Sequence, residues 1–215
     1  MARKPFDLEK GAIRPIKRGL WTAAAEKLSE AETAILSMEK AEHRAGYENA
    51  WTRFVDSLEG FWVRFYDEGK AQFSSFQPWA GKVEAVRKSE DLLQYLIQAR
   101  HQSQHGRIPM DWEQGKLLIA PGFNGHIKSL QTYADGTYEI DAKPLHDGLP
   151  EAKVVHSPGK PLLPTIVNKR FNQTFAPPER FDGQVISNRS PTGIARTALD
   201  FYLDVLKRAL EQFQT

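Results

Sequence analysis

The C-terminal segment, from about Thr192 to Gln212, most constrains the fold, because it is apolar around most of the circumference of a helix. The apolar residues of this region are Ile194, Ala198, Leu199, Phe201, Tyr202, Val205, Leu206, Leu210 and Phe213. Ser190 and Pro191 precede them as an N-cap and a first helical residue. A helix with so little polar surface is stable only when neighbours cover more than one side of it. The sequence therefore places this helix in a bundle or in a dimer interface.

Three earlier segments have the periodicity of helices that would cover such a helix. Apolar residues recur at helical spacing in residues 20–42 and again in residues 47–68. A third helix is expected over residues 89–104, with Ser89 as its N-cap. The connector before it is expected to contain a short helix at about 82–87. These segments predict a helical bundle.

The chain changes character after residue 114, where Gly, Pro and β-branched residues become frequent. The pair Asp135-Gly136 lies between two alternating segments, residues 126–133 and 137–143, and predicts a β-hairpin. Further short strands are expected at 117–119, 153–156, 164–168 and 184–186. The prolines in this region restrict its strands to edges and short pieces.

We therefore expect an α+β protein that is mainly a bundle of four to five helices, with a β-rich insertion before the last helix. The expected divisions are a basic N-terminal arm at 1–19, a helical bundle at 20–114, the β-rich insertion at 115–189 and the C-terminal bundle helix at 190–215. Because the last helix needs the earlier ones to cover it, all of these parts are assigned to a single domain.

The composition restricts the compartment and the chemistry. The chain has no cysteine, which excludes disulfides and thiolate metal ligands and is compatible with a reducing cytoplasm. Its N-terminus lacks the apolar region of a signal peptide, and no stretch approaches the ~20 apolar residues of a membrane span. We expect a cytoplasmic protein that does not cross a membrane.

The net charge of +2 is too small to argue for nucleic-acid binding by itself. Residues 1–19 are basic, with Arg3, Lys4, Lys10, Arg14, Lys17 and Arg18 against Asp7 and Glu9. Such an arm either follows phosphates or is a solvated terminus.

The helix at 89–104 ends in a polar run that contradicts its apolar face. Four apolar residues mark that face: Leu92, Leu93, Leu96 and Ile97. Continuing the same face leads to Arg100, His101 and His105. An arginine at the buried end of a helix is costly unless an anion meets it. These three residues are therefore the candidate functional site.

The order Arg100-His101-x-x-x-His105 resembles the signature of the HEPN superfamily, in which an arginine followed by Asn, Asp or His precedes a histidine at the end of a helix. Many members are metal-independent ribonucleases, often toxins of toxin–antitoxin or anti-phage systems, and others bind nucleotides or act as scaffolds. The resemblance implies an endoribonuclease in which Arg100 and His105 are catalytic and His101 supports them. It also implies RNA as substrate, an antitoxin or other protein partner, and a homodimer whose two motifs form one cleft.

The chemistry of these residues suits RNA cleavage without a metal. Histidine transfers protons near neutral pH, and arginine clamps a phosphate through two donors. At ~100° per residue, Arg100 and His105 lie about 140° apart around a helix, so they need not point at a single spot. The paired motifs of the homodimer that the resemblance implies would supply the second set of groups. His101 and His105 share a helix face, but only Asp111 is near enough in sequence as a third ligand. We expect neither a metal nor another cofactor.

Two other interpretations remain open. In the first, the chain is a non-catalytic nucleotide-binding, RNA-binding or interaction module that keeps the motif for its structure, and Arg100 pairs with a carboxylate of the bundle. In the second, it is a helical bundle of unrelated function.

Overall fold

The computed structural model describes residues 19–41, 43–103, 110–113, 116–119, 121–132, 138–157 and 159–213. These residues form two compact units. One unit is helical and contains the described residues up to 103 together with residues 165–213. The other contains the described residues of 110–164 and is made of β-strands. The chain is thus of mixed α+β class, as expected.

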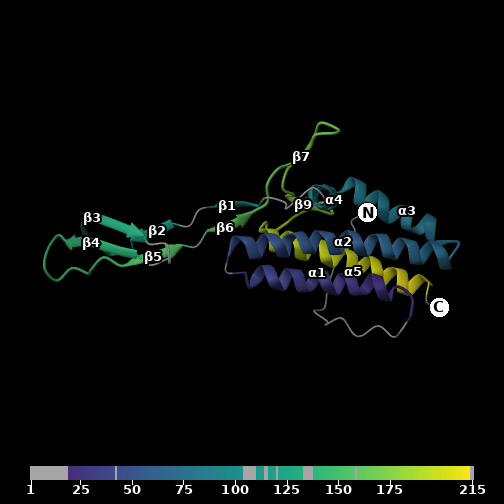
Figure 1. Ribbon diagram of the computed structural model, residues 1–215, viewed down its shortest axis with the longest axis horizontal. Helices are drawn as coiled ribbons and strands as arrows, with labels where there is room; N and C mark the ends of the chain where they lie inside the picture. The colour runs from purple at the N-terminus through teal and green to yellow at the C-terminus, as the bar shows by residue number, and fades with distance from the viewer. Residues whose placement is uncertain are drawn as a thin grey trace. The chain divides into compact units, whose positions relative to one another are not determined.

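Five helices make up the described part of the helical unit: α1 (Thr22–Glu39), α2 (Arg44–Gln72), α3 (Phe76–Ser89), α4 (Asp91–Ser103) and α5 (Pro191–Phe213). The most extensive helix–helix contact is between α1 and α2, and α5 packs against α1, α2 and α4 (Figure 1). The final helix is therefore covered by several neighbours, as its apolar circumference requires. No helix in the described ranges has the length and apolar character needed to span a membrane.

The core of this unit is rich in aromatic side chains. Trp21, Phe61, Phe65 and Phe76 are fully buried, and the Trp21 indole donates a hydrogen bond of 3.0 Å to the Phe65 carbonyl. The Phe213 ring at the end of α5 lies 6.2 Å from Trp21 and 5.7 Å from Phe76, measured between ring centroids. Aromatic pairs at these separations add specific edge and face contacts to the apolar burial. Trp21, just before α1, and Phe213, at the end of α5, thus belong to one aromatic cluster.

The start of α5 is as expected, and the start of α4 is not. The backbone N–H of Gly193 donates to the Ser190 hydroxyl at 3.1 Å, so Ser190 is a true N-cap. The prediction that Ser89 caps α4 is wrong, because Ser89 is the last residue of α3 and its hydroxyl donates to the Val86 carbonyl. The helix expected at 82–87 is longer and spans the whole of α3.

The β unit is a succession of nested antiparallel pairs. The pairs are β1 (Asp111–Glu113) with β6 (Lys160–Leu162), β2 (Lys116–Ile119) with β5 (Val154–Ser157), and β3 (Gly125–Thr132) with β4 (Tyr138–Pro144). The expected hairpin is confirmed in β3 and β4, with a register shift between Ile127 and Ser129. Its turn pair, Asp135-Gly136, lies outside the described residues. Figure 1 shows the three strand pairs one after another along the two chain segments that run side by side through this unit.

The β-rich segment expected at 115–189 is divided between the two units. Its later strands belong to the helical unit: β7 (Ile166–Asn168) pairs with β8 (Gln173–Phe175), and β9 (Arg180–Phe181) with β10 (Gln184–Val185). Of these, β7, β8 and β9 contact α4. The sequence predicts a single domain whose first helical part extends to residue 114. The structure instead groups residues 110–164 as a unit, because their strands pair only with one another.

Candidate functional site

The candidate site lies at the C-terminal end of α4. This helix is held in the bundle by its fully or nearly fully buried Leu92, Leu93, Leu96 and Ala99. Asp91 stands in its first turn, and Arg100 and His101 stand in its last. The negative charge of Asp91 and the positive charge of Arg100 each interact favourably with the helix dipole. Both residues therefore stabilise α4.

Arg100 meets the anion that its position requires. Its Nε lies 2.8 Å from Oδ1 of Asp56, which is contributed by α2. The Arg100 side chain is 26% exposed and that of Asp56 45% exposed, so the pair is half-buried and remains accessible to solvent. A charge-assisted contact of this length fixes the position of the guanidinium. The structure thus brings together Arg100 and a carboxylate that lies 44 residues earlier in the chain.

His101 is exposed on the same turn of α4 as Arg100. His105, the second residue of the predicted catalytic pair, lies outside the described residues, as does the segment that joins α4 to β1. The described residues contain no group of three or more His, Asp or Glu side chains that could hold a metal ion. Among the described residues, the end of α4 presents the guanidinium of Arg100, paired with Asp56, and the imidazole of His101.

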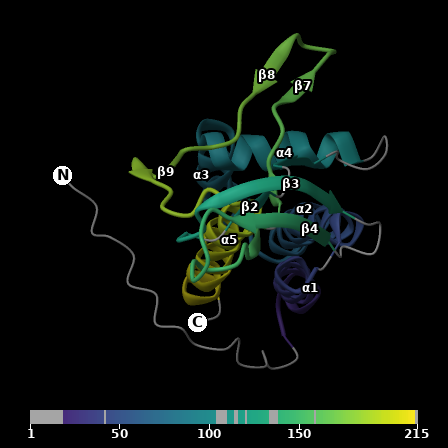
Figure 2. The same ribbon diagram turned by 90° about the vertical axis from the view of Figure 1, so that its left-hand side faces the viewer.

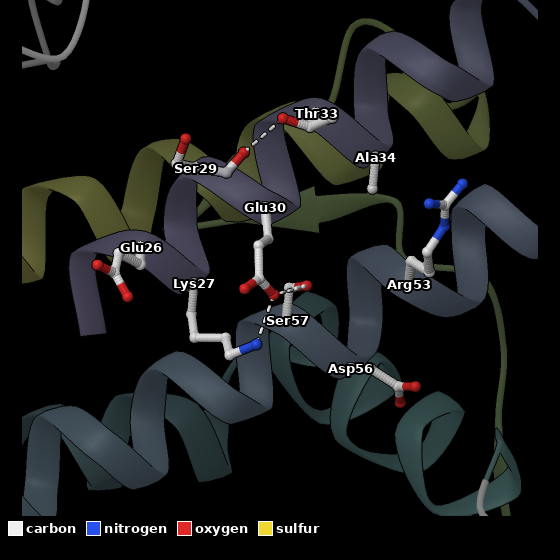
Figure 3. A pocket seen from close by; sticks show the side chains of 9 residues that line it. All are labelled: Glu26, Lys27, Ser29, Glu30, Thr33, Ala34, Arg53, Asp56 and Ser57. Atoms are coloured by element: carbon white, nitrogen blue, oxygen red, sulfur yellow. Dashed lines mark hydrogen bonds and ion pairs between the residues drawn. The ribbon is translucent and has the colours of Figure 1, made fainter. Parts of the chain in front are cut away.

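A groove of about 670 Å³ lies between α1 and α2 and borders the candidate site (Figure 3). Its lining residues are Glu26, Lys27, Ser29, Glu30, Thr33 and Ala34 of α1 and Arg53, Asp56 and Ser57 of α2. Glu30 accepts contacts from Lys27 at 2.5 Å and from the Ser57 hydroxyl at 3.4 Å. Because charges of both signs line it, the groove has no single electrostatic preference. It touches the candidate site through Asp56, the partner of Arg100.

A second polar cluster, which sequence analysis missed, is buried between α2, α3 and α5. Arg87 is only 2% exposed. Its guanidinium donates to the Tyr202 hydroxyl at 3.0 Å, to Glu84 at 2.7 Å and to Glu59 at 2.6 Å. The same group lies 4.3 Å from the centre of the Trp62 ring. Each of the three guanidinium nitrogens thus has a hydrogen-bond partner, which marks this cluster as structural.

Burial raises the pKa of the Tyr202 hydroxyl, although Arg87 beside it acts in the opposite direction. The hydroxyl therefore keeps its proton at neutral pH and accepts a hydrogen bond from Arg87 as a neutral group.

Asp56, the carboxylate that pairs with Arg100 in the candidate site, has no signal in the sequence. It is an exposed acidic residue on a helix with many others, and its spacing gives no signal. Only the need of Arg100 for an anion indicated that such a partner exists. Comparison of the chain with protein-family models, curated proteins and solved structures finds no match.

Proposed function

We propose that the chain is a metal-independent endoribonuclease of HEPN type, with Arg100 and His105 as catalytic residues and His101 in support. The observation that carries the proposal is the position of Arg100: it is held by Asp56 at the basic end of α4 and is 26% exposed, beside the exposed His101. A fixed, solvent-accessible arginine beside an imidazole is the arrangement that phosphate chemistry needs.

The proposed reaction is an internal displacement in the RNA backbone. The ribose 2′-oxygen attacks the neighbouring phosphorus as a base accepts its proton, and the bond from phosphorus to the 5′-oxygen breaks. An acid gives that 5′-oxygen a proton, so the products carry a 2′,3′-cyclic phosphate and a free 5′-hydroxyl. Histidine suits either proton transfer, since its ordinary pKa is about 6.5. Arg100 would stabilise the charge that develops on the phosphate.

Asp56 is a positioning residue in this proposal. It acts on the guanidinium of Arg100 through the contact with Nε and does not itself meet the RNA. A guanidinium held in one orientation presents its donors to a phosphate with less loss of side-chain entropy than a mobile one.

The direct test is incubation of the protein with a single-stranded RNA and with a DNA of the same sequence, with and without EDTA. We expect cleavage of the RNA alone, unchanged by EDTA, with products that end in 2′,3′-cyclic phosphate. The reason is that Arg100 supplies the positive charge that a metal supplies elsewhere and the 2′-hydroxyl is the nucleophile. Cleavage of DNA, or complete loss of cleavage in EDTA, would contradict the mechanism.

We also propose a two-fold homodimer that brings two α4 ends together, because one motif offers too few groups for both proton transfers. Two-fold dimers are the commonest closed assemblies. Light scattering of active protein at micromolar concentration is expected to give twice the chain mass of 24.4 kDa. A monomer that retains full activity would contradict the shared cleft. A cytoplasmic toxin or defence role, with an antitoxin or another protein partner, belongs to the same proposal.

One observation favours a second candidate, a non-catalytic nucleotide-binding, RNA-binding or interaction module. The Arg100–Asp56 pair is also what a structural arginine of a bundle would make. In that case RNA remains intact, and replacing Arg100 changes only stability. The cleavage assay above separates the two functions.

A further inference from the structure

The β7–β8 hairpin presents a basic and aromatic tip, residues 169–172, with the sequence Lys-Arg-Phe-Asn. Its strands pair in the register Ile166 to Phe175 through Asn168 to Gln173. Asn172 has a φ of 50°, the left-handed conformation that closes such a turn and that asparagine tolerates. Figure 2 shows the hairpin projecting beyond α4.

The base of this hairpin is anchored to α4, and its tip is exposed. Ile166 is 1% exposed, and the Asn168 side-chain amide donates to the Gln98 carbonyl oxygen of α4 at 2.9 Å. Val167 and Phe171 are 47% and 62% exposed. The hairpin therefore holds its tip in place from a fixed base next to the candidate site.

The tip has the chemistry of a nucleic-acid contact. The Arg170 guanidinium lies 5.2 Å from the centre of the Phe171 ring, so a cation and an aromatic surface are presented together. Residues 165–178 contain Lys169 and Arg170 but no carboxylate, in a chain that has 27 acidic residues. The neighbouring Asn168, Asn172 and Gln173 add amides that can hydrogen-bond to base edges.

The hairpin contacts α4 at Gln98, and the exposed His101 lies between Gln98 and Arg100 around the helix. At ~100° per residue, His101 lies about 60° around the helix from Gln98, and Arg100 lies about 100° further in the same direction. His101 thus stands between the side that holds the hairpin and the side that carries Arg100. A single strand of RNA that runs around the end of α4 from the Gln98 side would therefore pass His101 and then Arg100.

We propose that the β7–β8 tip grips the single-stranded RNA that the site cleaves, with Phe171 stacked on a base and Lys169 and Arg170 on adjacent phosphates. The inference builds on the proposed function, since it takes RNA as the substrate. A lipid surface is a weaker fit, because one aromatic ring and two cations fall short of the larger apolar face and basic cluster that membrane anchoring uses.

The test measures binding separately from cleavage. The probe is a fluorescent single-stranded RNA whose riboses are all 2′-O-methylated, so that no 2′-hydroxyl is present to attack. Fluorescence anisotropy with the full chain is expected to show that Phe171→Ala raises Kd about 5- to 150-fold, the range for loss of one stacked base. Phe171→Tyr is expected to stay within about twofold, because it keeps the ring.

The two cations are tested through the salt dependence of binding. Replacing both Lys169 and Arg170 by alanine is expected to reduce the slope of log Kd against log salt concentration by about 1.4, or 0.7 per phosphate contact on a single strand. Lys82→Ala, which removes an exposed lysine on α3, is the matched control and should leave both Kd and slope unchanged.

The outcomes distinguish this inference from the proposed function. Loss of probe binding in the Phe171→Ala variant supports the grip even if wild-type protein cleaves no RNA, and in that case only the cleavage proposal fails. Hairpin variants that bind the probe as tightly as wild type overturn the grip, whether or not RNA is cleaved. The grip is equally overturned if the same substitutions release the protein from vesicles of phosphatidylcholine and phosphatidylserine but leave RNA binding unchanged.

Discussion

Replacement of Arg87 by alanine is expected to lower the free energy of unfolding by about 3–5 kcal/mol, a large part of the ~5–15 kcal/mol that stabilises an ordinary domain. The substitution leaves the buried Tyr202 hydroxyl without its 3.0 Å partner and opens a cavity beside Trp62. It also leaves Glu59 and Glu84, which converge on one guanidinium, to repel each other. Denaturant titration followed by circular dichroism of the helices measures this loss.

Two further variants isolate the cause of that loss. Lys88→Ala removes the next side chain, which is 72% exposed and 3.4 Å from the same Glu84, and should change stability by at most ~0.5 kcal/mol. Arg87→Met keeps most of the apolar packing but removes the donors, and it should fall between wild type and Arg87→Ala. If Arg87→Ala unfolds within 1 kcal/mol of wild type, the cluster does not hold α2, α3 and α5 together.

The sequence contains no signal for this cluster, for a physical reason. Arg87 and Lys88 are adjacent and both positively charged, yet one is buried and the other exposed. What distinguishes them is the set of partners from distant parts of the chain, Glu59 28 residues earlier and Tyr202 115 residues later. Local periodicity reports which face of a helix is apolar, and it does not report which charged residue will be surrounded.

The extent of α3 was also underestimated from sequence. Pro78 and Gly81, which have low helix propensity, precede the short helix expected at 82–87. In the structure, Pro78 occupies the first turn, where a backbone N–H has no helical acceptor and its loss costs little. Burial of Phe76, Ala80 and Val83 then outweighs the propensity. Tertiary packing, which sequence periodicity shows only in part, decides where this helix begins.

The features that were predictable are those set by local chemistry. The apolar circumference of α5, its Ser190 cap and the alternation in β3 and β4 are each contained within one segment. The division into two units is different, because β1 pairs with β6 across almost fifty residues. For the candidate site, the sequence predicted that Arg100 needs an anion, and the structure supplies Asp56. The place of His105 relative to Arg100 stays a prediction.

The largest expected effect on activity comes from the two proposed catalytic residues. Arg100→Ala and His105→Ala should each reduce RNA cleavage by about 10²- to 10⁴-fold, because one removes phosphate stabilisation and the other a proton transfer. Arg100→Lys should recover little, since a lysine keeps the charge without the planar fork. His101→Ala should cost less, because the second position of the motif supports the other two residues. Initial rates on a labelled RNA measure each effect.

Stability measurements separate loss of chemistry from loss of fold in these variants. The Arg100–Asp56 pair is partly exposed, so Arg100→Ala should cost at most about 1 kcal/mol of stability. Asp56→Asn should slow cleavage less than Arg100→Ala, because Asp56 acts only through the guanidinium. Arg196→Ala is the matched control: it breaks a comparable exposed pair with Glu39 at 2.6 Å and should leave the cleavage rate unchanged. An Arg100→Ala, His105→Ala double variant that cleaves RNA at the wild-type rate would place the active site elsewhere, since no step of the proposed mechanism survives without both residues.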